Sequence, residues 1–222
     1  MSTTRWNALA VLAVGLASLA IALEPPAHAS DAHPRMRVAR VAHHVEGAPL
    51  GTTTTFKYKQ RKLLFSRNGA GGLAYVPAGA DRLRPLPIVV FLHGLNAEEQ
   101  MHPWLNGHEG DLRSLADQLI GSGAVESFVL AAPTHTRYAT GIKSMWPDFD
   151  LADFVGETSR ALRGDVQVDT SRVILIGHSA AGCNVAGGIL GPKARMPGLL
   201  ANVVVDTCMK PEIEAALAAQ TE

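Results

Sequence analysis

The sequence predicts an α/β protein built on a mostly parallel sheet with helices on both faces. From residue 88 onward, apolar runs of strand length alternate with helical patterns, an order typical of parallel sheets with right-handed crossovers. The run IVVFL at 88–92 is apolar without interruption, as in strands buried on both faces. No internal repeat or low-complexity linker divides the chain, so one domain over residues 53–222 is the simplest organisation.

An antiparallel pair of strands is expected ahead of the parallel part. TTTFKYK at 53–59 is rich in β-forming residues, and LAYVPA at 73–78 follows the turn sequence RNGAGG at 67–72. Two such segments separated by Gly and Asn residues are the usual signature of paired antiparallel strands.

Four strands and four helices are expected after this pair. The strands are predicted at 88–92, 128–133, 173–176 and 202–205, and the helices at 111–121, 151–163, 180–190 and 211–219. The first two helices carry apolar residues at helical spacing, which gives each one buried stripe. Asp111 and Asp150 stand where N-caps are expected, and Pro211 suits the first turn of the last helix.

The composition points to a site rather than to a charged surface. The 222 residues are 47% hydrophobic, and 20 basic residues balance 20 acidic ones. A chain with no net charge creates no overall field that would recruit nucleic acid or an anionic membrane surface. No nucleic-acid partner is therefore expected.

The first 29 residues resemble a secretory signal peptide. Arg5 supplies the basic start, an apolar run covers 8–23, and AHA at 27–29 offers a cleavage site. An uncleaved anchor is the alternative, although the apolar run is short for a membrane-spanning helix. After cleavage we expect a secreted or periplasmic protein without a membrane segment, whose residues 30–52 form a loose N-terminal segment.

Ser179 is the strongest candidate for a catalytic residue. It follows directly on the predicted strand at 173–176 and precedes a run of small residues. In parallel sheets ligands bind outside the carboxyl ends of the strands, which is where this serine falls. A sharp turn from strand to helix would lift the hydroxyl clear of the sheet, and the small Gly177, Ala181 and Gly182 would leave room for it.

The segment Gly177-His178-Ser179-Ala180-Ala181-Gly182 resembles the nucleophile elbow, G-x-S-x-G, of the α/β-hydrolase superfamily. One departure is Ala181, which stands where the motif has its last glycine, with Gly182 one place later. FLHGLN at 91–96 resembles the His-Gly oxyanion segment of the same superfamily, through His93 and Gly94. Within the superfamily, the likeness is to secreted serine esterases and polyester depolymerases.

This resemblance implies a mechanism for Ser179. The serine would attack a carboxylic ester, from a small molecule or a polymer, and form an acyl-enzyme that water then hydrolyses. The backbone N–H groups of Leu95 and Ala180 would stabilise the oxyanion, and such a donor typically contributes about 3 kcal/mol. His93 would be structural, hydrogen-bonded beneath the loop. No cofactor and no metal are implied.

The base and the acid of a triad are harder to assign. In this superfamily the order along the chain is Ser, then Asp or Glu, then His, and no histidine follows His178. Three explanations stay open: a hydrolase domain that is incomplete at its C-terminus, His135 as an upstream base, or a non-catalytic hydrolase-like binding protein. Asp206 ends the strand at 202–205 and would be either the acid or a cap for the last helix.

Three further expectations concern the surroundings of this site. Trp104 and Trp146 would either line a substrate pocket or simply pack in loops. Cys183 and Cys208 would form a disulfide, as an exported protein allows, or stay separate thiols. An incomplete sheet would leave the strand at 202–205 as an apolar edge, which would favour self-association.

Overall fold

A computed structural model describes residues 48–58, 71–107, 110–135, 145–147 and 149–219. The predicted signal peptide, most of the N-terminal segment and most of the predicted turn at 67–72 lie outside these residues. Within them, no helix combines the length and the apolar character needed to cross a membrane.

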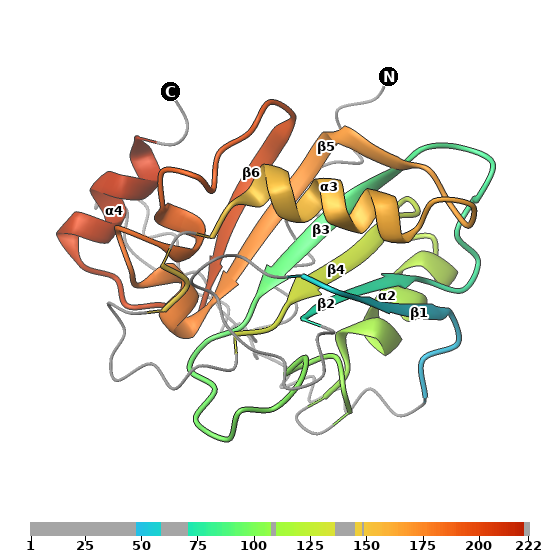
Figure 1. Ribbon diagram of the computed structural model, residues 1–222, viewed down its shortest axis with the longest axis horizontal. Coiled ribbons are helices and arrows are strands. Elements are labelled where there is room, and N and C mark those ends of the chain that lie inside the picture. The colour runs from blue at the N-terminus through green and yellow to red at the C-terminus, as the bar shows by residue number, and fades with distance from the viewer. Residues whose placement is uncertain (1–47, 59–70, 108–109, 136–144, 148, 220–222) are drawn as a thin grey trace, which may run out of the picture.

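The centre of the molecule is a mixed six-stranded sheet (Figure 1). In spatial order its strands are β1 (Thr52–Phe56), β2 (Gly72–Val76), β4 (Val129–Pro133), β3 (Leu86–Leu92), β5 (Val168–His178) and β6 (Leu199–Val205). β2 runs antiparallel to both β1 and β4, whereas β4, β3, β5 and β6 are parallel. The predicted mostly parallel sheet with an antiparallel pair at its start is confirmed.

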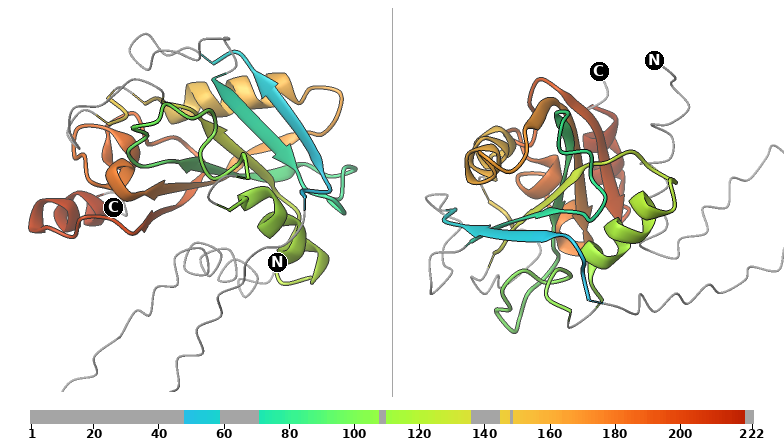
Figure 2. Two further views of the ribbon diagram at one scale, coloured as in Figure 1. Left: turned by 90° about the horizontal axis from the view of Figure 1, so that it is seen from below. Right: turned by 90° about the vertical axis from the view of Figure 1, so that its right-hand side faces the viewer.

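Helices cover the two faces of this sheet. Figure 2 shows α2 (Leu112–Gly121) and α3 (Leu151–Ala161) on opposite sides, and α4 (Pro211–Ala218) buries Ile213 in the core. Both predicted N-caps are confirmed, because the side chains of Asp111 and Asp150 accept hydrogen bonds from backbone N–H groups in the first turns. These caps satisfy donors that have no partner within the helix.

Successive side chains of each strand point to opposite faces of the sheet, so the core has two layers. Ile88, Val90 and Leu92 of β3 pack into the layer that contains α3, whereas Val89 and Phe91 face the layer that contains α2. The continuous apolar run in the sequence thus has a direct cause, because both faces of the strand are covered.

The predicted helix at 180–190 is wrong. A single 3₁₀ turn at Ser179–Gly182 follows β5, and a second one covers Gly188–Leu190. In a helix the N–H of Gly188 would bond the carbonyl of Asn184, but here it donates to the carbonyl of Trp146 at 3.0 Å. Glycines favour helices poorly, and this tertiary bond replaces the helical one.

β6 is the last strand of the described sheet. It pairs with β5 on one side, and no described strand pairs with its other side. Its residues are mostly half-buried, in contrast to the fully buried β3. Self-association through this strand stays a prediction.

A buried polar cluster fixes the N-terminal strand against α2. The Tyr75 hydroxyl donates to Asp117 Oδ2 at 2.6 Å and accepts from the N–H of Gly51 at 2.6 Å. The same carboxylate accepts from the N–H groups of Leu50 and Ala78, both at 2.7 Å. One aspartate on α2 therefore connects three separate parts of the antiparallel edge.

We predict that Tyr75→Phe lowers the free energy of unfolding by about 2 kcal/mol, because it leaves the N–H of Gly51 without its acceptor. Tyr58→Phe is the matched control. Tyr58 is buried as well, but its hydroxyl has no hydrogen-bond partner among the described residues. Urea denaturation should show no loss of stability for the control, because its buried hydroxyl has no hydrogen bond within the described part of the chain to lose. Equal losses in the two variants would contradict this interpretation.

Candidate active site

The turn after β5 holds Ser179 in an unusual backbone conformation. Its φ is +51°, in the left-handed region that residues with a side chain seldom adopt. Such a conformation persists only where the surroundings enforce it, and it is found most often at functional sites. Ser179 is half-buried and follows His178 at the carboxyl end of the strand. The expected sharp turn after the strand is observed, but a 3₁₀ turn follows it in place of the expected helix.

Gly94 packs directly against Ser179. A Cβ placed on Gly94 would lie 2.7 Å from Cβ of Ser179, 3.1 Å from its Oγ and 3.3 Å from Nδ1 of His178. The first distance is shorter than real Cβ contacts allow, so only glycine fits here without a shift of the backbone. The end of β3 and the end of β5 therefore meet at this point. Leu95 follows Gly94, and Ala180 follows Ser179.

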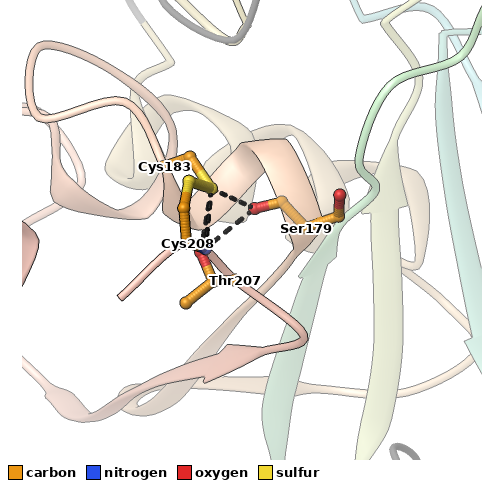
Figure 3. Close-up of a disulfide and its surroundings, with 4 residues drawn as sticks. All are labelled: Ser179, Cys183, Thr207 and Cys208. Carbon is orange, nitrogen blue, oxygen red and sulfur yellow. Dashed lines mark hydrogen bonds between the residues drawn. A yellow bond between two sulfur atoms is a disulfide. The ribbon is translucent and has the colours of Figure 1, made fainter. Parts of the chain in front are cut away.

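The other side of Ser179 faces a disulfide (Figure 3). Cys183 and Cys208 are joined, with their Cα atoms 5.5 Å apart. Thr207 Oγ1 donates to the carbonyl oxygen of Ser179 at 3.2 Å. In Figure 3 this carbonyl points towards the disulfide, and the hydroxyl of Ser179 points away from it.

His178 and Asp206 are brought together at the same edge of the sheet. Nε2 of His178 lies 3.9 Å from Oδ2 of Asp206, whose side chain is 80% exposed. The ring of His178 also contacts Trp104, at 5.2 Å between ring centroids and edge to face. Trp104 is half-buried, and this ring contact places it beside the turn that carries Ser179. The predicted position of Asp206 at the end of its strand is observed, with the carboxylate next to His178.

His93 has a structural environment. Its Nδ1 lies 2.8 Å from the carbonyl oxygen of Gly94, and its Nε2 accepts the N–H of His135 at 2.9 Å. Burial lowers the pKa of His93 to about 3, so the imidazole is neutral near pH 7. With the proton on Nδ1, both ring nitrogens are satisfied, and the ring connects Gly94 to the backbone of His135 after β4.

His135 and Trp146 lie behind this loop rather than at an open pocket. Trp146 is fully buried, and its Nε1 donates to the carbonyl of His93 at 2.8 Å. The ring of His135 packs edge to face on Trp146 at 5.4 Å and is also buried. Trp146 thus packs against this loop, and a part for it in a substrate pocket stays a prediction.

The small residues around the turn each have a packing partner. The side chain of Ile189 lies against Gly177, and a Cβ on Gly182 would come within 2.6 Å of Thr207 Oγ1. Ala181, which departs from the motif, is accommodated fully buried. The sequence analysis did not identify Thr207. Its only local signal is that its hydroxyl side chain stands next to Cys208.

One described hollow lies elsewhere. It has a volume of about 370 Å³ and is lined by residues that include Arg82, Arg163 and Asp165. These residues precede β3 and β5, so the hollow lies at the amino ends of the strands. Ligands of parallel sheets bind at the carboxyl ends, and Ser179 rather than this hollow marks the candidate site.

Comparisons with known proteins find likeness in structure only. No protein-family model matches the chain, and no curated protein does. The solved structure of a protein designated FAE matches with 13% identity and a TM-score of 0.53, covering 80% of this chain and 63% of its own. The chain thus spans less than two thirds of that protein. Together with the strand order and the turn at Ser179, this match decides the fold.

The chain has the α/β-hydrolase fold. Two more solved structures are similar, at lower TM-scores. A ferulic acid esterase shares 15% identity with a TM-score of 0.47, covering 78% of this chain and 68% of its own. A ferulic acid esterase from Anaeromyces mucronatus, in complex with ferulic acid, shares 18% identity with a TM-score of 0.35, covering 62% and 52%. Ser179 lies on the turn after β5 and is the candidate nucleophile of this fold.

We predict that Gly94→Ala slows the reaction of Ser179 with a fluorophosphonate probe by at least about 10-fold. The added methyl group must displace either the nucleophile turn or the loop after β3, and small displacements at a reacting atom are costly. Labelling rates by intact-protein mass spectrometry measure this effect. Gly121→Ala is the matched control, because a Cβ there meets nothing within 4 Å. Equal rates for both variants would show that the close approach is irrelevant to reactivity.

Proposed function

We propose that this protein is an exported serine hydrolase that cleaves carboxylic esters through an acyl-enzyme on Ser179. The observation that carries the proposal is the conformation of Ser179, at a φ of +51° on the turn after β5 with Gly94 against its side chain. A non-glycine residue in this conformation needs support from its surroundings, and the glycine leaves the hydroxyl room.

The oxyanion donors of the proposal are the backbone N–H groups of Leu95 and Ala180. These residues directly follow the two that meet, Gly94 and Ser179. His93 supports this assignment, because its buried ring fixes the loop that presents Leu95. Rigid donors of this kind stabilise the charge on the carbonyl oxygen without having to reorganise during the reaction.

Export is the second part of the proposal. The N-terminal pattern of Arg5, the apolar run at 8–23 and AHA at 27–29 supports it. The disulfide between Cys183 and Cys208 also supports export, because disulfides persist in oxidising compartments outside the cytosol.

A second candidate function is a non-catalytic hydrolase-like protein that binds an ester or acyl ligand at the same site. A serine hydroxyl needs a base to become a strong nucleophile. Among the described residues, no histidine nitrogen forms a hydrogen bond with Ser179 Oγ. His135, the upstream candidate for the base, lies behind the loop with its ring against Trp146. This arrangement is the specific observation that favours the second function.

We predict that a fluorophosphonate probe labels Ser179 and that the protein hydrolyses p-nitrophenyl acetate. Ser179→Ala should abolish both activities. Ser159→Ala should leave both unchanged, because Ser159 lies within the helix α3. Peptide mapping of the labelled protein identifies the modified residue. Saturable binding of p-nitrophenyl acetate without labelling or turnover would instead establish the binding protein.

A further inference from the structure

The loop after β6 is fastened to the nucleophile turn. Cys208 belongs to this loop, Cys183 follows Ser179 by four residues, and the disulfide joins them. The N–H of Cys208 also donates to Cys183 Sγ at 3.0 Å. The disulfide thus places Thr207, the residue before Cys208, directly beside the turn, as Figure 3 shows.

Thr207 is the hydrogen-bond donor to the carbonyl of Ser179. Its Oγ1 lies 3.2 Å from this oxygen, and Sγ of Cys183 lies 3.3 Å from the same atom. The sulfur carries no hydrogen once it is part of a disulfide, so the hydroxyl of Thr207 must supply the proton. Gly182 makes room for this contact, because a Cβ there would lie 2.6 Å from Thr207 Oγ1.

The orientation of one peptide plane depends on this bond. The peptide between Ser179 and Ala180 is planar and trans, so its C=O and its N–H point in opposite directions. When Thr207 holds the carbonyl on the side of the disulfide, the N–H of Ala180 points to the opposite side. Figure 3 shows the hydroxyl of Ser179 directed away from the disulfide as well.

We infer that Thr207, held by the Cys183–Cys208 disulfide, is a positioning residue for the Ser179 nucleophile and for the N–H of Ala180. The inference rests on the proposed function, because it assigns Ala180 to the oxyanion site. Asp206 and Met209 on either side of Thr207–Cys208 are exposed. The disulfide is the covalent link between this loop and the turn, and it adds to the contact of Thr207 with Gly182.

Two substitutions at Thr207 test the inference. Thr207→Val keeps the shape of the side chain and removes the donor, whereas Thr207→Ser keeps the donor. Thr207→Val should lower the labelling rate of Ser179 and the kcat for p-nitrophenyl acetate by about 5- to 10-fold, as expected for one neutral hydrogen bond. KM should stay unchanged, and Thr207→Ser should restore the wild-type kcat. Wild-type rates in Thr207→Val would overturn the inference.

Reduction of the disulfide between Cys183 and Cys208 tests whether this bond holds Thr207 in place. Dithiothreitol supplies two electrons and two protons, which convert the S–S bond into two thiols while dithiothreitol becomes a cyclic disulfide. The reduced protein should label as slowly as Thr207→Val, and reduction of Thr207→Val should add little, because both changes remove one contact. The Cys183→Ala/Cys208→Ala variant should be slow and insensitive to dithiothreitol. Equal labelling rates before and after reduction would refute the role of the disulfide.

A conformational measurement separates this inference from the proposed function. If oxidised wild-type protein reacts neither with the probe nor with the ester, the proposed function fails. Hydrogen exchange of the amides in 179–183 then decides the inference alone. Thr207→Val and reduction should each speed this exchange at least about 5-fold, whereas Thr207→Ser should not. Unchanged exchange rates in Thr207→Val and after reduction would overturn the inference.

Discussion

The site depends on the close approach of two neighbouring strand ends. β3 and β5 pair in parallel up to the partners Leu92 and Gly177, and two residues later on each strand the chain reaches Gly94 and Ser179. Because the register is fixed through the buried centre of the sheet, these two residues are forced against each other. The core thus brings the candidate nucleophile to the end of β3, and the bond from Thr207 then holds the carbonyl of Ser179 in place.

Backbone strain gathers at the same edge of the sheet. Non-glycine residues with positive φ include Ser179 after β5, Asp206 after β6, and His102 and Trp104 in the loop after β3. Each such conformation costs about 1–3 kcal/mol. Local contacts offset part of this cost, such as the bond between His102 and Thr134 and the one from Thr207 to the carbonyl of Ser179. The two core layers provide the rigidity that keeps these residues in place.

Much of this arrangement was predictable from the sequence, because the signals are local. A strand is indicated by the apolar run at 88–92 itself, and two helix starts by the aspartates at 111 and 150. The structure confirms these three elements. The position of Ser179 at a strand end follows from the same kind of pattern.

The segment 180–190 and Thr207 could not be predicted, because tertiary contacts decide them. The small residues after Ser179 fit a helix by pattern, but the carbonyl of Trp146 takes the N–H of Gly188. The role of Thr207 depends on a partner 28 residues away in the sequence, to which no periodicity points.

We propose that the hydroxyl of Ser179 and the N–H groups of Leu95 and Ala180 surround one reacting group. A crystal structure of the protein phosphonylated by a fluorophosphonate would test this arrangement. We expect phosphorus bonded to Ser179 Oγ, with the phosphoryl oxygen at hydrogen-bond distance, about 2.7–3.1 Å, from both amide nitrogens. A phosphoryl oxygen in contact with solvent alone, or with other donors, would contradict it.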